Sequence, residues 1–270
     1  MAGSQPGSFW IIGCGNMGGA MLRGWLANGL DPASVTVIDP QLPALPDGVT
    51  VVAELPEAGV PGRVLLSVKP QLLDAVTPGL AARLGRETLL LSILAGVETE
   101  SLRSRFATPH AIVRIMPNTP AAIGKGVIAL YSSDADGAAR GDVETLMAPL
   151  GLVEWIGAES QFDAVTALSG SGPAFLFRFI DALGQAGAAL GLPADQAARF
   201  ALATVEGSAL LAAAAPESPA ALAERVASPG GSTREGMNIL DADQALISLL
   251  TRTLAAAERR NAEMAAAAKR

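Results

Sequence analysis

The segment from Phe9 to Asp39 constrains the fold of this 270-residue chain more than any other. A continuous apolar run, Phe9–Ile12, leads at once into Gly13-Cys14-Gly15-Asn16-Met17-Gly18. An apolar-striped segment over residues 19–28 and a second apolar run, Val35–Asp39, follow. A strand, a G-x-G-x-x-G turn, a helix and a second strand are typical of the first part of a dinucleotide-binding parallel sheet. The alternative is a glycine-rich turn that binds no ligand.

The spacing of the three glycines matches the needs of such a site. Gly13 permits the tight turn, Gly15 lets the backbone approach a pyrophosphate, and Gly18 lets the helix pack closely on the strand. We therefore expect the whole turn to contact the cofactor: Gly13, Cys14, Gly15, Asn16, Met17 and Gly18. Cys14 is expected to be a small packing residue within it and not a nucleophile.

Asp39 ends the second predicted strand and has two interpretations. A carboxylate at this position can accept hydrogen bonds from the adenosine ribose hydroxyls, which favours NAD and repels the 2′-phosphate of NADP. Alternatively, Asp39 is a turn residue in front of Pro40 and a proline-rich stretch.

Further polar residues follow predicted strands. Lys69 and Pro70 come after the run Val64–Val68, and Asn118 comes after Ala111–Met116. Ligands of open α/β sheets bind beyond the carboxyl ends of the strands, so we expect Val68, Lys69, Pro70 and Asn118 beside the cofactor. The amide of Asn118 could orient a nicotinamide ring, whereas Lys69 could equally be a solvated loop lysine.

The strand pattern ends near Gln161, and helical segments fill the rest of the chain. We predict an α/β fold with a Rossmann-type domain over residues 1–160 and an all-helical domain over residues 161–270, interrupted at Ser169–Pro173. The alanine-rich helices carry apolar residues on more than one face, which indicates burial against a second copy of the chain. Packing wholly within one subunit is the alternative.

Composition excludes several classes of function. The net charge of −7 argues against a nucleic-acid partner. The sequence has no run of about 18 uncharged apolar residues, so we expect no membrane-spanning helix. With one cysteine and one histidine, a His/Cys metal site and a Ser-His or Cys-His nucleophile are not expected. A cytoplasmic protein fits this cysteine usage.

One loop of the helical domain carries its own signal, in the stretch Ser228-Pro229-Gly230-Gly231-Ser232-Thr233. Pro229 and the glycine pair should end one helix, and Ser232 or Thr233 should cap the next. The exposed N–H groups of such a helix start suit a small carboxylate. The alternative is an ordinary helix–helix connection.

This residue set suits hydride transfer, in which the cofactor performs the difficult step. A protonated cyclic imine is already electrophilic and needs no strong protein acid or base. The hydroxyl of Thr233 near its nitrogen, and the Gly231–Ser232 backbone near a carboxylate, could suffice.

Five motifs together resemble one family, Δ1-pyrroline-5-carboxylate reductase. They are Ile12–Gly18, Val68-Lys69-Pro70-Gln71, Met116-Pro117-Asn118-Thr119-Pro120, Leu168-Ser169-Gly170-Ser171-Gly172-Pro173-Ala174-Phe175 and Ser228–Thr233. The resemblance implies reduction of the cyclic imine to L-proline with NADPH or NADH, and a dimer built by the helical domain, often assembled into decamers. It implies that Thr233 acts at the pyrroline nitrogen, that Gly231 and Ser232 hold the carboxylate, and that Glu159 lies near the substrate. Asp39-Pro40 departs from the Ser or Asn followed by Arg that suits a 2′-phosphate, which makes NADH a serious contender.

Two other functions stay open. A β-hydroxyacid dehydrogenase shares the two-domain plan but generally uses a lysine in the helical domain, and this chain has none between Lys125 and Lys269. A non-catalytic dinucleotide-sensing dimer would bind cofactor without turning over any imine. Glu159 could likewise be a solvated loop residue.

Overall fold

The computed structural model describes residues 5–268, which form two compact units. The first comprises Met1–Ser171 together with Ala257–Arg270, and the second comprises Gly172–Ala256. The predicted domain boundary at residue 160 precedes the point where these units divide, and it stays a prediction.

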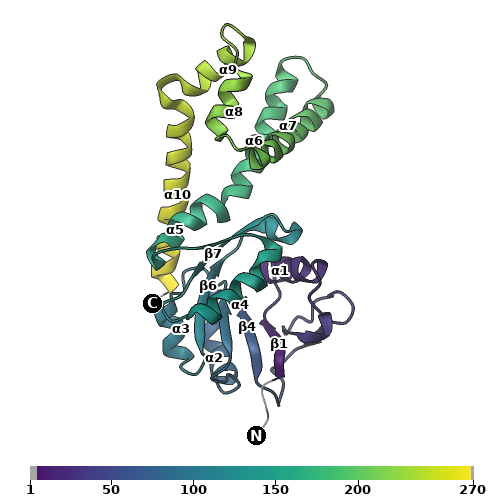
Figure 1. The fold of residues 1–270 in the computed structure, drawn as a ribbon, viewed down its shortest axis with the longest axis vertical. Helices are drawn as coiled ribbons and strands as arrows, with labels where there is room; N and C mark the ends of the chain where they lie inside the picture. Colours follow the sequence, from purple (N-terminus) through teal and green to yellow (C-terminus); the bar gives the residue numbers. More distant parts are fainter. Residues whose placement is uncertain (1–4, 269–270) are drawn as a thin grey trace. The chain divides into compact units, whose positions relative to one another are not determined.

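In the described residues the first unit is built on a sheet of eight strands in the order β3-β2-β1-β4-β5-β6-β7-β8. Figure 1 labels β1, β4, β6 and β7 of this sheet. Only the β6–β7 pair is antiparallel. The strands are β1 Gln5–Ile12, β2 Val35–Ile38, β3 Thr50–Val52, β4 Pro61–Leu66, β5 Leu89–Ser92, β6 Ala111–Met116, β7 Gly126–Tyr131 and β8 Gly151–Trp155. The chain runs from β1 outward to β3, then crosses back to β4 on the other side of β1. The strand order therefore reverses between β1 and β4, which is where open α/β sheets bind their ligands.

Helices cover both faces of this sheet because its central strands are apolar on both sides. Phe9 and Ile11 of β1 pack with α1 (Asn16–Ala27) and α4 (Gly137–Met147), whereas Trp10 and Ile12 pack with α2 (Leu73–Ala81) and α3 (Thr99–Arg105). Successive side chains of a strand point to opposite faces, so continuous apolar runs are what two covered faces require. The predicted α/β fold with a Rossmann-type N-terminal part is confirmed.

The end of the first unit contains a finding that the sequence pattern did not predict. After α5 (Phe162–Val165), residues Thr166–Gly170 form a π-helical turn, so the interruption expected over Ser169–Pro173 is reduced to a bend at Ser171. The N–H of Ser171 donates to the carbonyl of Thr166 at 2.8 Å, and α6 (Gly172–Ala189) begins at the next residue. Pro173 lies within the first turn of α6, where proline is tolerated because an N–H at this position would have no acceptor within α6 itself.

The last residues of α10 (Ala245–Ala268) also belong to the first unit. The side chain of Asn261 donates to the carbonyl of Asp163 at 3.4 Å. The turn at Gly96 lies so close to this helix that a Cβ there would sit 3.0 Å from the Cα of Ala265. The C-terminal helix therefore packs against the loop that follows β5.

The second unit consists of helices only: α6, α7 (Ala194–Ala214), α8 (Pro219–Val226), α9 (Ser232–Asp241) and the first part of α10. Gly184 lets α6 approach α7, because a Cβ there would lie 3.2 Å from the Cα of Ala198. Large apolar side chains of this unit stay exposed, among them Phe177 at 64% and Phe200 at 52%. By length and composition alone α7 could also cross a membrane, and 11% of its 18-residue apolar window is buried. Exposed apolar surface of this extent indicates a partner.

Candidate active site

Two hollows flank the point where the strand order reverses. The first, of about 760 Å³, lies at the carboxyl ends of β1 and β2 and is lined by the glycine turn, Asp39 and Val68. The second, of about 640 Å³, is lined by residues after β4 and β5 and at the end of β6, with the C-terminal helix as a further wall. Val68 and Lys69 line the first hollow and Pro70 lines the second, so this predicted segment separates the two.

The glycine turn has the geometry that its sequence predicts. Gly13 adopts a φ of +85°, which favours glycine, and its N–H donates to the carbonyl of Ile38 at 2.8 Å. A Cβ at Gly18 would lie 2.7 Å from Oγ of Ser67, which is why the helix can pack so closely here. A Cβ at Gly15, in contrast, would meet nothing within 4 Å, so that side of the turn is open for a ligand.

The helix that follows begins within the motif. Asn16 and Met17 form the first turn of α1, with Gly15 as the residue before it and without a side-chain cap. A helix start without a cap leaves backbone N–H groups available to an anion, and the dipole favours negative charge there. An open glycine, uncapped N–H groups and the adjoining hollow together fit a dinucleotide pyrophosphate.

Asp39 is tied to the glycine turn and is not only a turn residue. Its Oδ2 accepts the N–H of Cys14 at 2.8 Å, and its Oδ1 accepts the N–H of Gln41 at 2.9 Å. The pKa of Cys14 is raised, chiefly by burial and also by the negative charge of Asp39. A buried cysteine with a raised pKa remains a thiol, which agrees with the packing role that the sequence suggested.

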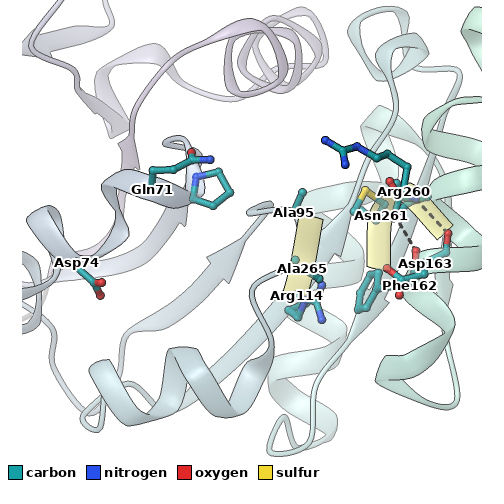
Figure 2. Close-up of a pocket in the computed structure, with 13 residues that line it drawn as sticks. Gln71, Asp74, Ala95, Arg114, Phe162, Asp163, Arg260, Asn261 and Ala265 are labelled. Atoms are coloured by element: carbon teal, nitrogen blue, oxygen red, sulfur yellow. Dashed lines mark hydrogen bonds between the residues drawn. The ribbon is translucent and has the colours of Figure 1, made fainter. Parts of the chain in front are cut away.

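The second hollow contains polar and charged side chains to which the sequence analysis gave no role in the site. Gln71 and Asp74 lie on one side of it, and Arg260 and Asn261 of the C-terminal helix lie on the other (Figure 2). Ala95 and Gly96, from the turn after β5, form part of its floor. The C-terminal helix could not be placed here from sequence, because its distance along the chain gives no signal of this contact.

Glu159 is half-buried in an internal network and is not the solvated residue that was one alternative. Its Oε1 accepts from the N–H of Thr99 and from Arg114, both at 2.7 Å, while its Oε2 accepts from the hydroxyl of Thr99 at 2.8 Å. The guanidinium of Arg114 also lies over the ring of Phe162, 4.2 Å from its centroid. Arg114 lines the second hollow, so Glu159 borders the predicted site through this arginine.

A signal for this pair does exist in the sequence. The run Ala-Ile-Val-Arg-Ile-Met places one charged residue in an otherwise apolar buried strand. A buried arginine requires a carboxylate partner, but nothing in the spacing identifies Glu159 as that partner.

Asn118 is buried, and its amide connects two of the family motifs. Its Oδ1 accepts the N–H of Val127 at 2.9 Å, and its Nδ2 donates to the carbonyl of Ser169 at 3.0 Å. In a continuous α-helix that carbonyl would accept the N–H of residue 173, which here is a proline. Asn118 therefore satisfies a carbonyl that Pro173 leaves without a helical donor.

The predicted substrate residues Gly231, Ser232 and Thr233 belong to the second unit. Gly231 is the residue before α9, and no side chain caps this helix, so the expected cap by Ser232 or Thr233 is wrong. Both residues lie inside the first turn, where the hydroxyl cannot reach back to a free N–H as an N-cap side chain does. Glu235 does lie in that turn, as expected.

The start of α9 leaves donors available. The N–H of Gly231 donates to the carbonyl of Ser228 at 3.0 Å, whereas a helix start leaves the N–H groups of Ser232 and Thr233 without an intrahelical acceptor. In the part of the chain that the structure describes, no side chain or carbonyl accepts from either hydroxyl. Arg234 holds this loop in place, since it pairs with Glu224 of α8 at 2.5 Å and donates to the carbonyl of Ala227 at 3.2 Å.

Across residues 5–268, no cluster of three or more His, Cys, Asp or Glu side chains could hold a metal ion.

Comparisons with known proteins agree with this arrangement. The family described as pyrroline-5-carboxylate reductase dimerisation matches residues 159–264, and NADP oxidoreductase coenzyme F420-dependent matches residues 8–96. A structure from Coxiella burnetii, described as a pyrroline-5-carboxylate reductase, superposes with a TM-score of 0.85 at 32% identity, covering 95% of this chain and 98% of its own. A Plasmodium falciparum pyrroline carboxylate reductase solved with NADP bound shares the fold, with a TM-score of 0.81 at 24% identity over 97% of this chain and 100% of its own.

A curated relative supplies the decisive similarity. The pyrroline-5-carboxylate reductase of Pseudomonas aeruginosa is 38% identical over 262 residues, which cover 94% of this chain and 96% of the relative. With such similarity over nearly the whole length, this chain belongs to the pyrroline-5-carboxylate reductase family.

Proposed function

We propose that this protein reduces 1-pyrroline-5-carboxylate to L-proline with NAD(P)H. The observation that carries the proposal is the pair of hollows on either side of Val68-Lys69-Pro70. A dinucleotide cofactor needs an adenosine site and a nicotinamide site on opposite sides of the strand-order reversal. The first hollow supports the adenosine half, and the second supports the nicotinamide half and the substrate.

The bound cofactor supplies a hydride, and the chain's own residues position the reaction. The imine carbon gains the hydride, the C=N double bond becomes a single bond, and the protonated nitrogen keeps its proton. The hydroxyl of Thr233 contacts that nitrogen, and the N–H groups of Ser232 and Thr233 hold the substrate carboxylate at the start of α9. In this proposal Gly231 shapes the loop, because its own N–H already donates to Ser228.

The remaining predicted residues divide between holding the cofactor and shaping the site. Gly13, Cys14, Gly15, Asn16, Met17 and Gly18 hold the pyrophosphate, and Asp39 contacts the adenosine ribose. Val68, Lys69 and Pro70 lie along the cofactor between the two hollows. Asn118 and Glu159 support the nicotinamide side, the first by fixing the Ser169 segment and the second by holding Arg114.

The functional assembly is a homodimer made by the helical domain. The dimerisation-family match and the exposed apolar side chains of α6 and α7 support it. A decamer of such dimers, a cytoplasmic location and the absence of nucleic-acid or membrane partners complete the proposal. In the dimer, the partner covers the apolar surface of α7.

Variants at Thr233 test the proposed chemistry. Thr233→Ala should lower kcat about a hundredfold, the scale at which losing one positioned hydrogen-bond donor affects turnover. Thr233→Ser should retain much of the activity, and both variants should bind reduced cofactor as the wild type does. The control is Thr145→Ala, which removes an exposed helical threonine from α4.

Two outcomes would contradict this assignment. Loss of cofactor binding in Thr233→Ala, with kcat preserved at saturation, would place Thr233 at the cofactor instead of the imine. Wild-type protein that binds cofactor but turns over no imine would favour a dinucleotide-sensing dimer. A β-hydroxyacid dehydrogenase remains disfavoured by the absence of a lysine between Lys125 and Lys269.

A further inference from the structure

The adenosine end of the first hollow has a feature that decides between two cofactors. Asp39 directly follows β2 there, and NADP differs from NAD by a phosphate on the ribose that a residue at this position of a dinucleotide-binding sheet would contact. We infer that this protein binds NADH in preference to NADPH, and that Asp39 is the determinant. The inference rests on the proposed function in assuming that the reaction uses a nicotinamide dinucleotide. The preference itself can be measured by cofactor binding in the absence of substrate.

The carboxylate of Asp39 is fixed in place. Each of its oxygens accepts a backbone N–H, from Cys14 at 2.8 Å and from Gln41 at 2.9 Å. A carboxylate has about four acceptor positions, so about two remain for the hydroxyls of a ribose. Rotating the side chain away to admit a phosphate would break both backbone hydrogen bonds.

Just after β2, the backbone N–H groups are not available to a phosphate, and Gln41 offers only a neutral side-chain amide. Pro40 has no N–H, and the N–H of Gln41 is already used by Asp39. In addition, Glu54 lines the same hollow and contributes a second negative charge.

The positive charge that lines this hollow is distant from Asp39. Lys69 is the basic residue among its described lining residues, and it follows β4. Because β1 lies between β2 and β4, the two strand ends are about 10 Å apart at the usual strand spacing. Lys69 is therefore suited to the middle of the dinucleotide and not to its 2′-phosphate.

The expected effect is large enough to measure. A 2′-phosphate carries a charge of about −1.5 to −2 near neutral pH, and placing it against a fixed carboxylate is unfavourable. We expect the Kd for NADPH to exceed the Kd for NADH by at least about tenfold, which corresponds to 1.4 kcal/mol. The difference should shrink as salt is added, because exposed charges are screened.

Calorimetric titration of the full-length protein with NADH and with NADPH, without substrate, tests the inference. Asp39→Ser and Asp39→Asn should reduce the ratio of the two Kd values by about tenfold. Glu57→Gln is the matched control, because it removes the same charge from an exposed side chain that does not line the hollow. The ratio should stay at the wild-type value in that variant.

The outcomes separate this inference from the proposed reaction. Equal or tighter binding of NADPH by the wild type would overturn it, even if the protein reduces pyrroline-5-carboxylate rapidly. A ratio that both Asp39 variants leave unchanged would overturn the role of Asp39. Preferential binding of NADH without any imine turnover would support it while contradicting the proposed function.

Discussion

Asn118 provides the most informative stability experiment, because it connects the loop after β6 to the segment before α6. The side chain is 6% exposed and makes two hydrogen bonds, with the N–H of Val127 and the carbonyl of Ser169. Asn118→Ala would leave the half-buried N–H of Val127 and the half-buried carbonyl of Ser169 without these hydrogen bonds. Each such loss costs about 1–3 kcal/mol, so we expect unfolding free energy to fall by about 3 kcal/mol.

Thermal unfolding at one fixed protein concentration measures this loss. For units of this size, 1 kcal/mol corresponds to roughly 2–4 °C, so the variant should melt roughly 6–12 °C below the wild type. Asn28→Ala is the matched control, because Asn28 is exposed and donates only to the carbonyl of Gly24. Water can replace that bond, so its loss should cost less than about 1 kcal/mol.

A second substitution tests the physical reason directly. Pro173→Ala restores an N–H that can donate to the carbonyl of Ser169 when Asn118 is absent. The double variant Asn118→Ala/Pro173→Ala should therefore be less destabilised than the sum of the single variants, by about 1 kcal/mol. Losses of unfolding free energy that simply add in the double variant would refute this role of Asn118. The same holds if Asn118→Ala has the same melting temperature as Asn28→Ala. If Asn118 also touches the nicotinamide, Asn118→Ala should raise the Kd for NADH even when binding is measured well below the melting temperature of the variant.

Three further results are expected. Gly15→Ala should weaken NADH binding with little loss of stability, because a Cβ there meets nothing within 4 Å in the protein. Gly18→Ala should also destabilise the fold, because its Cβ would lie 2.7 Å from Oγ of Ser67. Calorimetry measures the binding and melting curves measure the stability, and equal melting points for the two variants would contradict this expectation. Burial tends to raise the pKa of Asp134, but hydrogen bonds from the N–H of Ile112, from Arg103 and from Ser132 outweigh burial and lower the pKa. The ionised carboxylate therefore stabilises the fold above about pH 4, and this contribution is lost below that pH. The stability difference between wild type and Asp134→Asn should thus be constant from about pH 6 to 8 and shrink in acid, and a difference that grows in acid would contradict the sign. Phe177→Glu, at a side chain 64% exposed in one chain, should dissociate the dimer in light scattering, and an unchanged mass would exclude this face from the interface.

The architecture of the nucleotide unit could be predicted because its determinants are local. Apolar runs identify strands buried on both faces, and the glycines at 13, 15 and 18 reflect a turn whose steric demands are short in range. The segments after the predicted strands lie at the carboxyl edge for the same reason. These are properties of neighbouring residues, which a sequence displays directly.

The parts that were missed depend on contacts between distant residues. The pairing of Arg114 with Glu159 and the packing of Asn261 beside Asp163 join segments that no periodicity connects. The cap at α9 failed for a local reason, since the helix begins one residue earlier than a Ser232 cap requires. A Gly-Gly sequence fixes the position of a helix start only to within a residue or two.

Reduction of 1-pyrroline-5-carboxylate by the purified wild-type protein tests the central claim most directly. The decisive measurement is the initial rate of reduced-cofactor oxidation, with the product identified as L-proline. The account predicts rapid, imine-dependent oxidation of NADH and stoichiometric formation of L-proline. Protein that is folded and binds NADH, yet oxidises none of it with this imine, would contradict the account.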